Sequence, residues 1–266
     1  MGVRILCLHG MGVNADIFKV QTACFRKLLP LDYEFVFLQG LAECEPAPGV
    51  AAFFPGPYRC WYDTPTSTKV KKAHVAVLDY IKAFGPFDGV MGFSQGAAVA
   101  ASILLHHQLD GLSPPFRLGI FICSPLPFSH SLNHGIDTRA YFGSPTDVAV
   151  RRDCPNEVPA HLITDEKYLR GEERLAAAGL STTAPTQASF YQMFHPTVDH
   201  VRVTIPTVHI TGARDRWRRH SLDVAMLCSA ELAVSFEHTG GHEIPPDFAE
   251  DMCDLIEGVV SVAMAV

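Results

Sequence analysis

Short runs of apolar residues recur along the chain and alternate with longer segments in which apolar residues follow helical spacing. The run 3–8, interrupted only by Arg4, is typical of a strand buried on both faces of a parallel sheet. Segment 69–84 repeats apolar residues every three or four positions, which predicts an amphipathic helix. The predicted strands are 3–8, 33–38, 87–93, 117–123, 207–211 and 233–236; the predicted helices are 15–29, 69–84, 97–105, 218–227 and 249–263.

This alternation of strands and helices predicts an α/β fold with a doubly wound, mostly parallel sheet. Two segments depart from it. Periodicity vanishes in the proline-rich segment 39–68, where the aromatic residues favour an ordered binding loop. From about 125 to 200, helical fragments (160–167 and 172–178) lie among prolines and glycines, which we interpret as an insertion or cap over the sheet. We therefore expect a single domain, 1–266, with one insertion.

Composition excludes several classes of protein. The chain has 266 residues, a net charge of −7, and no lysine or arginine run that would suggest a nucleic-acid groove. No apolar run reaches the roughly 18 residues of a membrane span, and no signal-peptide pattern begins the chain, so a cytoplasmic location is expected. The eight cysteines include no C-x-x-C pair and are interpreted as reduced core thiols, with no metal or cofactor expected.

The pentapeptide Gly92–Gly96 reads G-x-S-x-G between a predicted strand and an alanine-rich predicted helix. In this context the pattern indicates a sharp strand–turn–helix that exposes the central serine, with glycines where a Cβ would collide. Ser94 is therefore the candidate nucleophile. The pattern also occurs by chance, so Ser94 needs a base and an acid before it indicates an enzyme.

Two late loops offer those partners at the carboxyl ends of predicted strands. Asp215 follows the strand 207–211, and His242 follows the strand 233–236 behind two glycines that let the backbone bend over the sheet. The rival residues fit less well. The alternatives Asp223 and His220 fall inside a predicted helix, Asp199 and Asp247 follow no strand, and His238 lacks flanking glycines.

An oxyanion hole requires two amides directed at one point. We expect one from Gln95, the residue after the candidate nucleophile, and one from Met11 in the glycine-bearing loop after the first strand. His9 lies in the same loop and is interpreted as packing and hydrogen-bonding that loop rather than as a base.

These segments together resemble the eukaryotic family of serine hydrolases within the α/β-hydrolase superfamily. The resemblance implies an α/β-hydrolase fold with Ser94 as nucleophile, Asp215 as acid and His242 as base. The chain departs from the family after the strand 117–123, where members typically have a Ser-Gly-aromatic turn and this chain has Cys123–Leu126. Segment 130–200 is also poorly matched. The residues that carry the resemblance are Leu8–Asn14, Pro55–Asp63, Gly92–Gly96, Thr211–Asp215 and Gly240–Pro245.

Fungal members of this family include stand-alone thioesterases that release products from polyketide synthases. The resemblance thus implies hydrolysis of an acyl thioester or ester through an acyl-serine, on a polyketide or fatty-acyl chain held by an acyl carrier protein. A small-ester carboxylesterase, a cyclising enzyme and a binding module on an inactive hydrolase scaffold remain alternatives. The predicted substrate-binding residues are Trp61, Tyr62, Phe93 and Leu126, with Met11, Phe128, Phe190, Tyr191 and Phe194 as further candidates for contact or for core packing.

Overall fold

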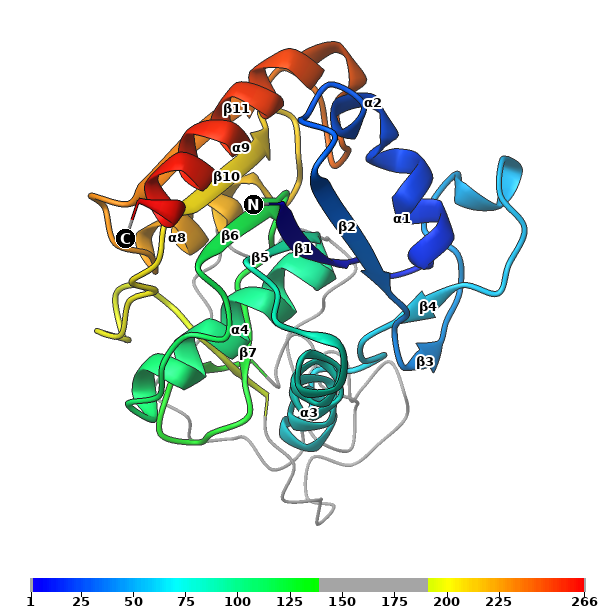
Figure 1. Ribbon diagram of the computed structural model, residues 1–266. Coiled ribbons are helices and arrows are strands. Elements are labelled where there is room, and N and C mark those ends of the chain that lie inside the picture. The colour runs from blue at the N-terminus through cyan, green and yellow to red at the C-terminus, as the bar shows by residue number, and fades with distance from the viewer. Residues whose placement is uncertain (1, 139–190, 266) are drawn as a thin grey trace.

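A six-stranded sheet with the order β11-β10-β6-β5-β1-β2 forms the centre of the molecule (Figure 1). The computed structural model describes residues 2–138 and 191–265. Every strand pairing in this sheet is parallel, as the buried apolar runs indicated. The strands are β1 (Val3–Leu8), β2 (Tyr33–Leu38), β5 (Gly89–Phe93), β6 (Leu118–Ile122), β10 (Thr207–Gly212) and β11 (Ala233–His238).

Helices cover both faces of the sheet, and each face has its own apolar core (Figure 1). On one face lie α1 (Ala15–Gln21), α2 (Ala23–Arg26) and α9 (Ala249–Met264), which follows the short 3-10 helix η3 (Pro246–Phe248). On the other lie α3 (Ser67–Phe84), α4 (Gln95–Leu109) and α8 (Arg218–Met226). The doubly wound α/β-hydrolase fold predicted from the sequence is confirmed.

Helix caps explain where the first helices begin and why one prediction was wrong. The Asn14 side chain accepts a hydrogen bond from the Ile17 amide at 2.8 Å and starts α1 as expected. The predicted helix 15–29, however, is divided at Thr22, whose hydroxyl donates to the Phe18 carbonyl at 2.9 Å. Such local side-chain bonds compete with regular helix, so α1 and α2 are short.

The proline-rich segment after β2 is ordered and packs beside the sheet. It contains the antiparallel pair β3 (Ala42–Glu43) and β4 (Arg59–Cys60), with the 3-10 helix η1 (Val50–Ala52) between them. β4 also reaches the loop after β1, because the Gly12 amide donates to the Arg59 carbonyl at 3.0 Å. This segment therefore holds the loop after β1 in place by hydrogen bonding.

A small antiparallel sheet of order β7-β9-β8 lies beyond β6. Its strands are β7 (Phe128–Ser129), β8 (Ile136–Asp137) and β9 (Gln192–Met193). The predicted helical fragments 160–167 and 172–178 and the candidate Phe190 lie outside the described residues. Among the helices that the structure describes, none combines the length and apolar character needed to cross a bilayer.

Candidate active site

Ser94 lies at the sharp turn between β5 and α4. Its backbone is in an unusual conformation, with φ at 51° and ψ at −121°. No residue with a side chain fits at either flanking glycine, because a Cβ on Gly92 would overlap Ala97 and a Cβ on Gly96 would overlap the Leu8 carbonyl. The turn therefore depends on both glycines, and it places the Ser94 hydroxyl at the carboxyl edge of the sheet.

Three side chains from distant parts of the chain form a continuous hydrogen-bonded relay. The Nε2 atom of His242 lies 2.9 Å from the Oγ atom of Ser94, and its Nδ1 atom lies 2.9 Å from Oδ2 of Asp215. Asp215 follows β10, and His242 lies on the loop after β11. In this arrangement the serine hydroxyl donates to a histidine, and a carboxylate orients that histidine. This is the geometry that nucleophilic acyl transfer requires.

The Asp215 carboxylate is buried, and its surroundings favour the ionised form. Burial alone would raise its pKa, but the hydrogen bond and charge of His242 outweigh it, and the net pKa lies below the usual value. The Trp217 amide adds a hydrogen bond to Oδ1 at 2.8 Å. The acid of the relay is therefore held as a fixed negative charge.

The loop that carries His242 is tied to the loop that carries Asp215. The Arg214 amide donates to the Gly240 carbonyl at 2.9 Å, and a Cβ on Gly212 would overlap the Gly241 carbonyl. The rival His238 is buried and accepts a hydrogen bond from the Gly240 amide at 3.1 Å. His238 therefore shapes the turn, while His242 reaches Ser94.

Cys123, at the end of β6, is a neighbour of the relay that sequence reasoning did not single out. Its sulfur, an Asp215 carboxylate oxygen and a His242 ring nitrogen lie within 4.8 Å of one another. Burial, and then the Asp215 charge, raise the pKa of this thiol to about 12, so it remains a hydrogen-bond donor. These three are the group among the described residues that could hold a metal ion, but Asp215 and His242 already bond to each other.

Met11 and Gln95, whose amides are expected to form the oxyanion hole, lie in the loop after β1 and at the start of α4, and both line a cavity together with Ser94. Gln95 is the first residue of α4, so its amide is one of those that a helix leaves without an internal partner. Met11 lies in the loop after β1, and within the described part of the chain its amide donates no hydrogen bond. His9 packs this loop as expected: its ring contacts the Gly10 carbonyl at 2.7 Å, and burial lowers its pKa to about 4.

Two cavities have Ser94 and His242 in their linings and extend from these residues in different directions. The first, of about 660 Å³, lies towards α1 and the His242 loop and is lined by Val20, Cys24, Phe93 and Ile244 among others. The second, of about 450 Å³, lies towards α4 and β7 and is lined by Tyr62, Ala98, Leu126, Phe128, Met193, Trp217 and His220 among others. Both share Met11, Ala47, Pro48, Ser94, Arg216 and His242.

The structure distributes the predicted substrate-binding residues unevenly. Phe93 lines the first cavity, and Tyr62 and Leu126 line the second. Trp61 lines neither: it is 2% exposed, and its indole nitrogen donates to the His9 carbonyl at 2.9 Å. Its predicted substrate contact is therefore replaced by a structural one. The further candidates Tyr191 and Phe194 are also buried away from both cavities, whereas Phe128 lines the second.

The fold and the relay together define a serine hydrolase of the α/β-hydrolase class. The model of the serine hydrolase (FSH1) family matches residues 1–250, and the chain belongs to this family. It is 34% identical to Esterase alnB of Emericella nidulans over 91% of this chain and 90% of that protein. It is 31% identical to Esterase FPY3 of Fusarium mangiferae over 98% and 99% of the two chains.

Solved structures show the same fold at low sequence identity. A carboxylesterase from Mesorhizobium loti superposes with a TM-score of 0.54 at 14% identity, covering 96% of this chain and 88% of that one. The family match makes the protein a serine hydrolase, and the solved structure supports the fold.

Proposed function

We propose that Ser94 is the nucleophile, His242 the general base and Asp215 the acid of an acyl-transfer cycle. The observation that carries this proposal is the relay of two 2.9 Å contacts through the His242 ring. Ser94 attacks the substrate carbonyl while Nε2 of His242 takes its proton, and Asp215 stabilises the imidazolium that forms. The amides of Met11 and Gln95 bind the oxyanion.

The cycle then divides into two halves. The carbon–sulfur or carbon–oxygen bond of the substrate breaks, and the leaving thiol or alcohol takes the proton from His242. Water next attacks the acyl-serine while His242 accepts a proton from it, and His242 passes that proton to Ser94 as the free acid leaves. The chain's own residues supply each of these proton transfers.

The substrate we propose is a thioester with a bulky acyl chain of polyketide or fatty-acyl type. Two mainly apolar cavities meet at the Ser94 hydroxyl, which leaves room for large groups on both sides of a scissile bond. An acetyl or methyl ester would fill only a small fraction of these cavities, so their size favours a substrate with larger groups.

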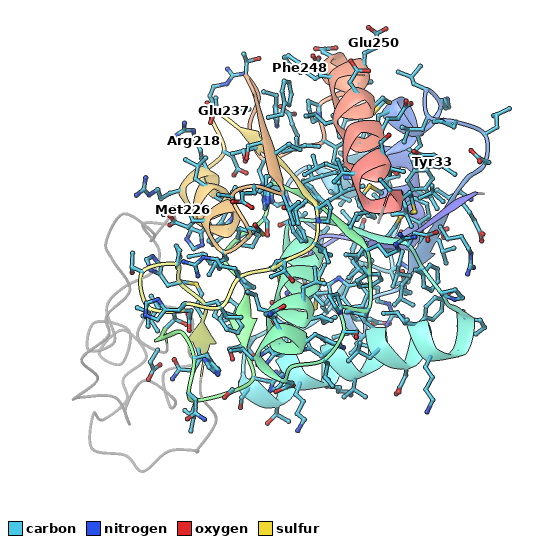
Figure 2. The ribbon with its side chains drawn as sticks, turned by 60° about the vertical axis from the view of Figure 1, so that its left-hand side comes forward. Tyr33, Arg218, Met226, Glu237, Phe248 and Glu250 are labelled. Carbon is cyan, nitrogen blue, oxygen red and sulfur yellow. The ribbon has the colours of Figure 1, made fainter. Side chains whose placement is uncertain are left out.

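An acyl carrier protein in the cytoplasm is the proposed donor of this acyl chain. Carriers are acidic, and four arginines lie close to Asp215. Three of them are engaged: Arg214 donates to the Thr239 carbonyl at 2.8 Å, Arg218 contacts Glu237 at 2.7 Å (Figure 2), and Arg219 lies 3.9 Å from Asp223. Arg216 lines both cavities. We propose that a carrier-bound substrate approaches the site beside this arginine.

Matched thioesters and oxygen esters test this proposal. We would measure kcat/KM for N-acetylcysteamine thioesters and ethyl esters from acetyl to dodecanoyl. The proposal predicts higher values for thioesters and a rise with acyl length. A preference for acetyl oxygen esters that declines with length would instead favour the second candidate, a small-ester carboxylesterase, which the names of the two fungal relatives support. The products should be free acids; a lactone or carbocycle would indicate cyclisation.

A further inference from the structure

The two proposed oxyanion amides belong to separate loops, and Trp61 connects them. The indole nitrogen of Trp61 donates to the carbonyl of His9 at 2.9 Å, which holds the loop that carries Met11. The backbone amide of Trp61 donates to Oε1 of Gln95 at 2.9 Å. One residue thus hydrogen-bonds both to the loop after β1 and to the first residue of α4, two segments that also pack against each other at Gly96.

The Gln95 side chain is held at both of its polar atoms. Besides accepting from Trp61, it donates through Nε2 to the Tyr62 carbonyl at 2.7 Å. It is 8% exposed, so these bonds are shielded from water. The first turn of α4, with the Gln95 amide, is therefore fixed to segment 61–62.

The far end of this connection is also fixed. The Gly40 amide donates to Nε2 of the buried His9 ring at 2.9 Å, and the Gly12 amide donates to the Arg59 carbonyl at 3.0 Å. Met11 itself is 44% exposed, so its own side chain packs weakly. The position of the Met11 amide thus depends on bonds made by its neighbours.

We propose that Trp61 is a positioning residue that sets the separation between the Met11 and Gln95 amides. The inference rests on the oxyanion hole of the proposed function. Two donors stabilise an oxyanion only when both lie about 2.7–3.1 Å from it, a tolerance that two unconnected loops would not keep. The series Gln95–Trp61–His9 supplies that constraint from inside the protein.

The experiment compares Trp61→Phe, which removes the indole donor but keeps a buried ring, with wild type. Active sites are first counted by titration with a fluorophosphonate, so that inactive protein does not enter the rates. We then measure kcat and KM for a thioester and Ki for a trifluoromethyl ketone, whose hemiketal oxyanion requires both amides. We expect kcat to fall about 10- to 100-fold and Ki to rise by a similar factor, with KM nearly unchanged.

A second variant and a control separate positioning from stability. Gln95→Leu breaks the same series at its other end, so the double variant should be no worse than the more affected single variant. Phe116→Leu alters another buried aromatic before β6 and should lower stability without changing Ki.

Three outcomes would overturn the inference. Unchanged kcat and Ki in Trp61→Phe would show that the connection positions nothing, and a raised KM with unchanged kcat would make Trp61 a substrate contact. If the ketone failed to inhibit wild type, the proposed oxyanion hole would itself be wrong, and the inference would fall with it.

Discussion

The Nε2 atom of His242 lies 2.9 Å from the hydroxyl of Ser94, although 148 positions separate the two residues in the chain. They meet because β5 and β11 are parallel members of one sheet, so the loops after both strands emerge at the same edge. Asp215 emerges from β10 at that edge and contacts the same ring at 2.9 Å. The sheet topology therefore assembles the site.

Replacing Asp215 with asparagine should nearly abolish activity while leaving the fold intact. Asparagine can still accept from the Trp217 amide, but it neither holds the required tautomer of His242 nor stabilises the imidazolium. We expect kcat to fall by about 10⁴-fold. Steady-state kinetics with a thioester would measure this, and a fall of less than about 10-fold would contradict the proposed role of Asp215.

Replacing Cys123 should slow catalysis moderately, and serine should restore much of the loss. The Cys123 thiol is a buried donor beside Asp215 and also lies 3.5 Å from the Glu243 carbonyl in the His242 loop. Cys123→Ala removes that donor, and we expect kcat to fall about 3- to 10-fold, corresponding to a hydrogen bond of roughly 1 kcal/mol. Equal activity of the alanine and serine variants would show that the donor has no role.

Blocking one cavity should change selectivity for one side of the scissile bond. Ala98 lines the second cavity and Val20 the first, so Ala98→Leu and Val20→Phe fill different spaces. We would compare kcat/KM ratios for long against short acyl groups, and for large against small leaving thiols, within each variant. We expect the two variants to lower different ratios. Loss of the same ratio in both would contradict the view that the cavities hold opposite sides of the substrate.

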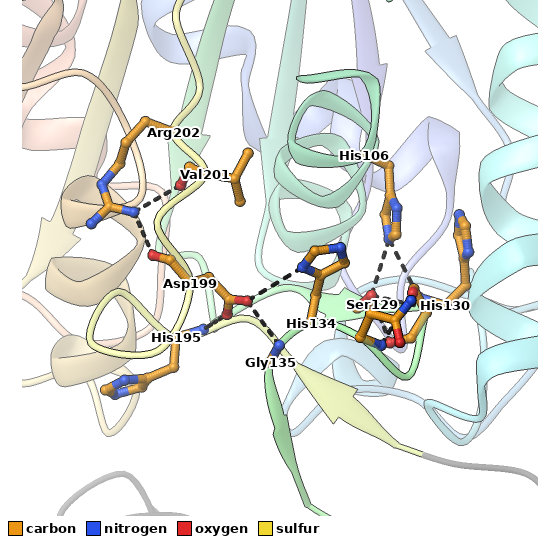
Figure 3. Close-up of polar contacts among 11 residues, drawn as sticks. His106, Ser129, His130, His134, Gly135, His195, Asp199, Val201 and Arg202 are labelled. Atoms are coloured by element: carbon orange, nitrogen blue, oxygen red, sulfur yellow. Dashed lines mark hydrogen bonds and ion pairs between the residues drawn. The ribbon is translucent and has the colours of Figure 1, made fainter. Parts of the chain in front are cut away.

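A buried histidine cluster should make the fold sensitive to acid. His106 on α4 accepts hydrogen bonds through Nε2 from the His130 amide and lies 3.2 Å from the Ser129 hydroxyl (Figure 3). Burial, and then His130 and other histidines, lower the pKa of His106 to about 3, and burial and its histidine neighbours also lower the pKa of His74. Lys71 and Asp110 are the other charged groups that act on the cluster, through His130.

The sign of this effect follows from the lowered pKa. Between about pH 6.5 and 3, unfolded His106 binds a proton that folded His106 does not, so stability is full above this window and falls as the pH drops through it. Each such proton contributes a slope of up to about 1.4 kcal/mol per pH unit. Urea unfolding from pH 7 to pH 5 should show this slope. His106→Gln should flatten it, and the exposed His200→Gln should leave it unchanged; a parallel slope in His106→Gln would contradict the account.

Local chemistry in the sequence was sufficient to predict most of the fold. Apolar runs predicted all six strands of the central sheet, and the four inner strands are buried almost throughout, because a strand covered on both faces has no polar alternation. The G-x-S-x-G turn could likewise be predicted locally, because a Cβ on Gly92 or Gly96 would overlap neighbouring backbone atoms. The division of the first helix at Thr22 was missed because a single hydroxyl-to-carbonyl bond leaves no periodic signal.

The surroundings of the site were harder to predict, since they depend on contacts between distant segments. Trp61 was expected to face substrate because aromatic residues in loops often do, but its indole bonds to His9, 52 positions away. Cys123 was read as an ordinary core thiol, and only the packing of β6 against the Asp215 loop shows its position. An unexpected Cys123–Leu126 turn after that strand was the one sequence signal that pointed there.

Intact-mass spectrometry of wild type and Ser94→Ala, after rapid mixing with a panel of acyl thioesters, tests the central claim most directly. The account predicts a transient mass increase equal to the acyl group on wild type and none on Ser94→Ala, with hydrolysis lost in the variant. An acyl adduct of equal yield on both proteins, or thioester turnover by Ser94→Ala at the wild-type rate, would contradict it.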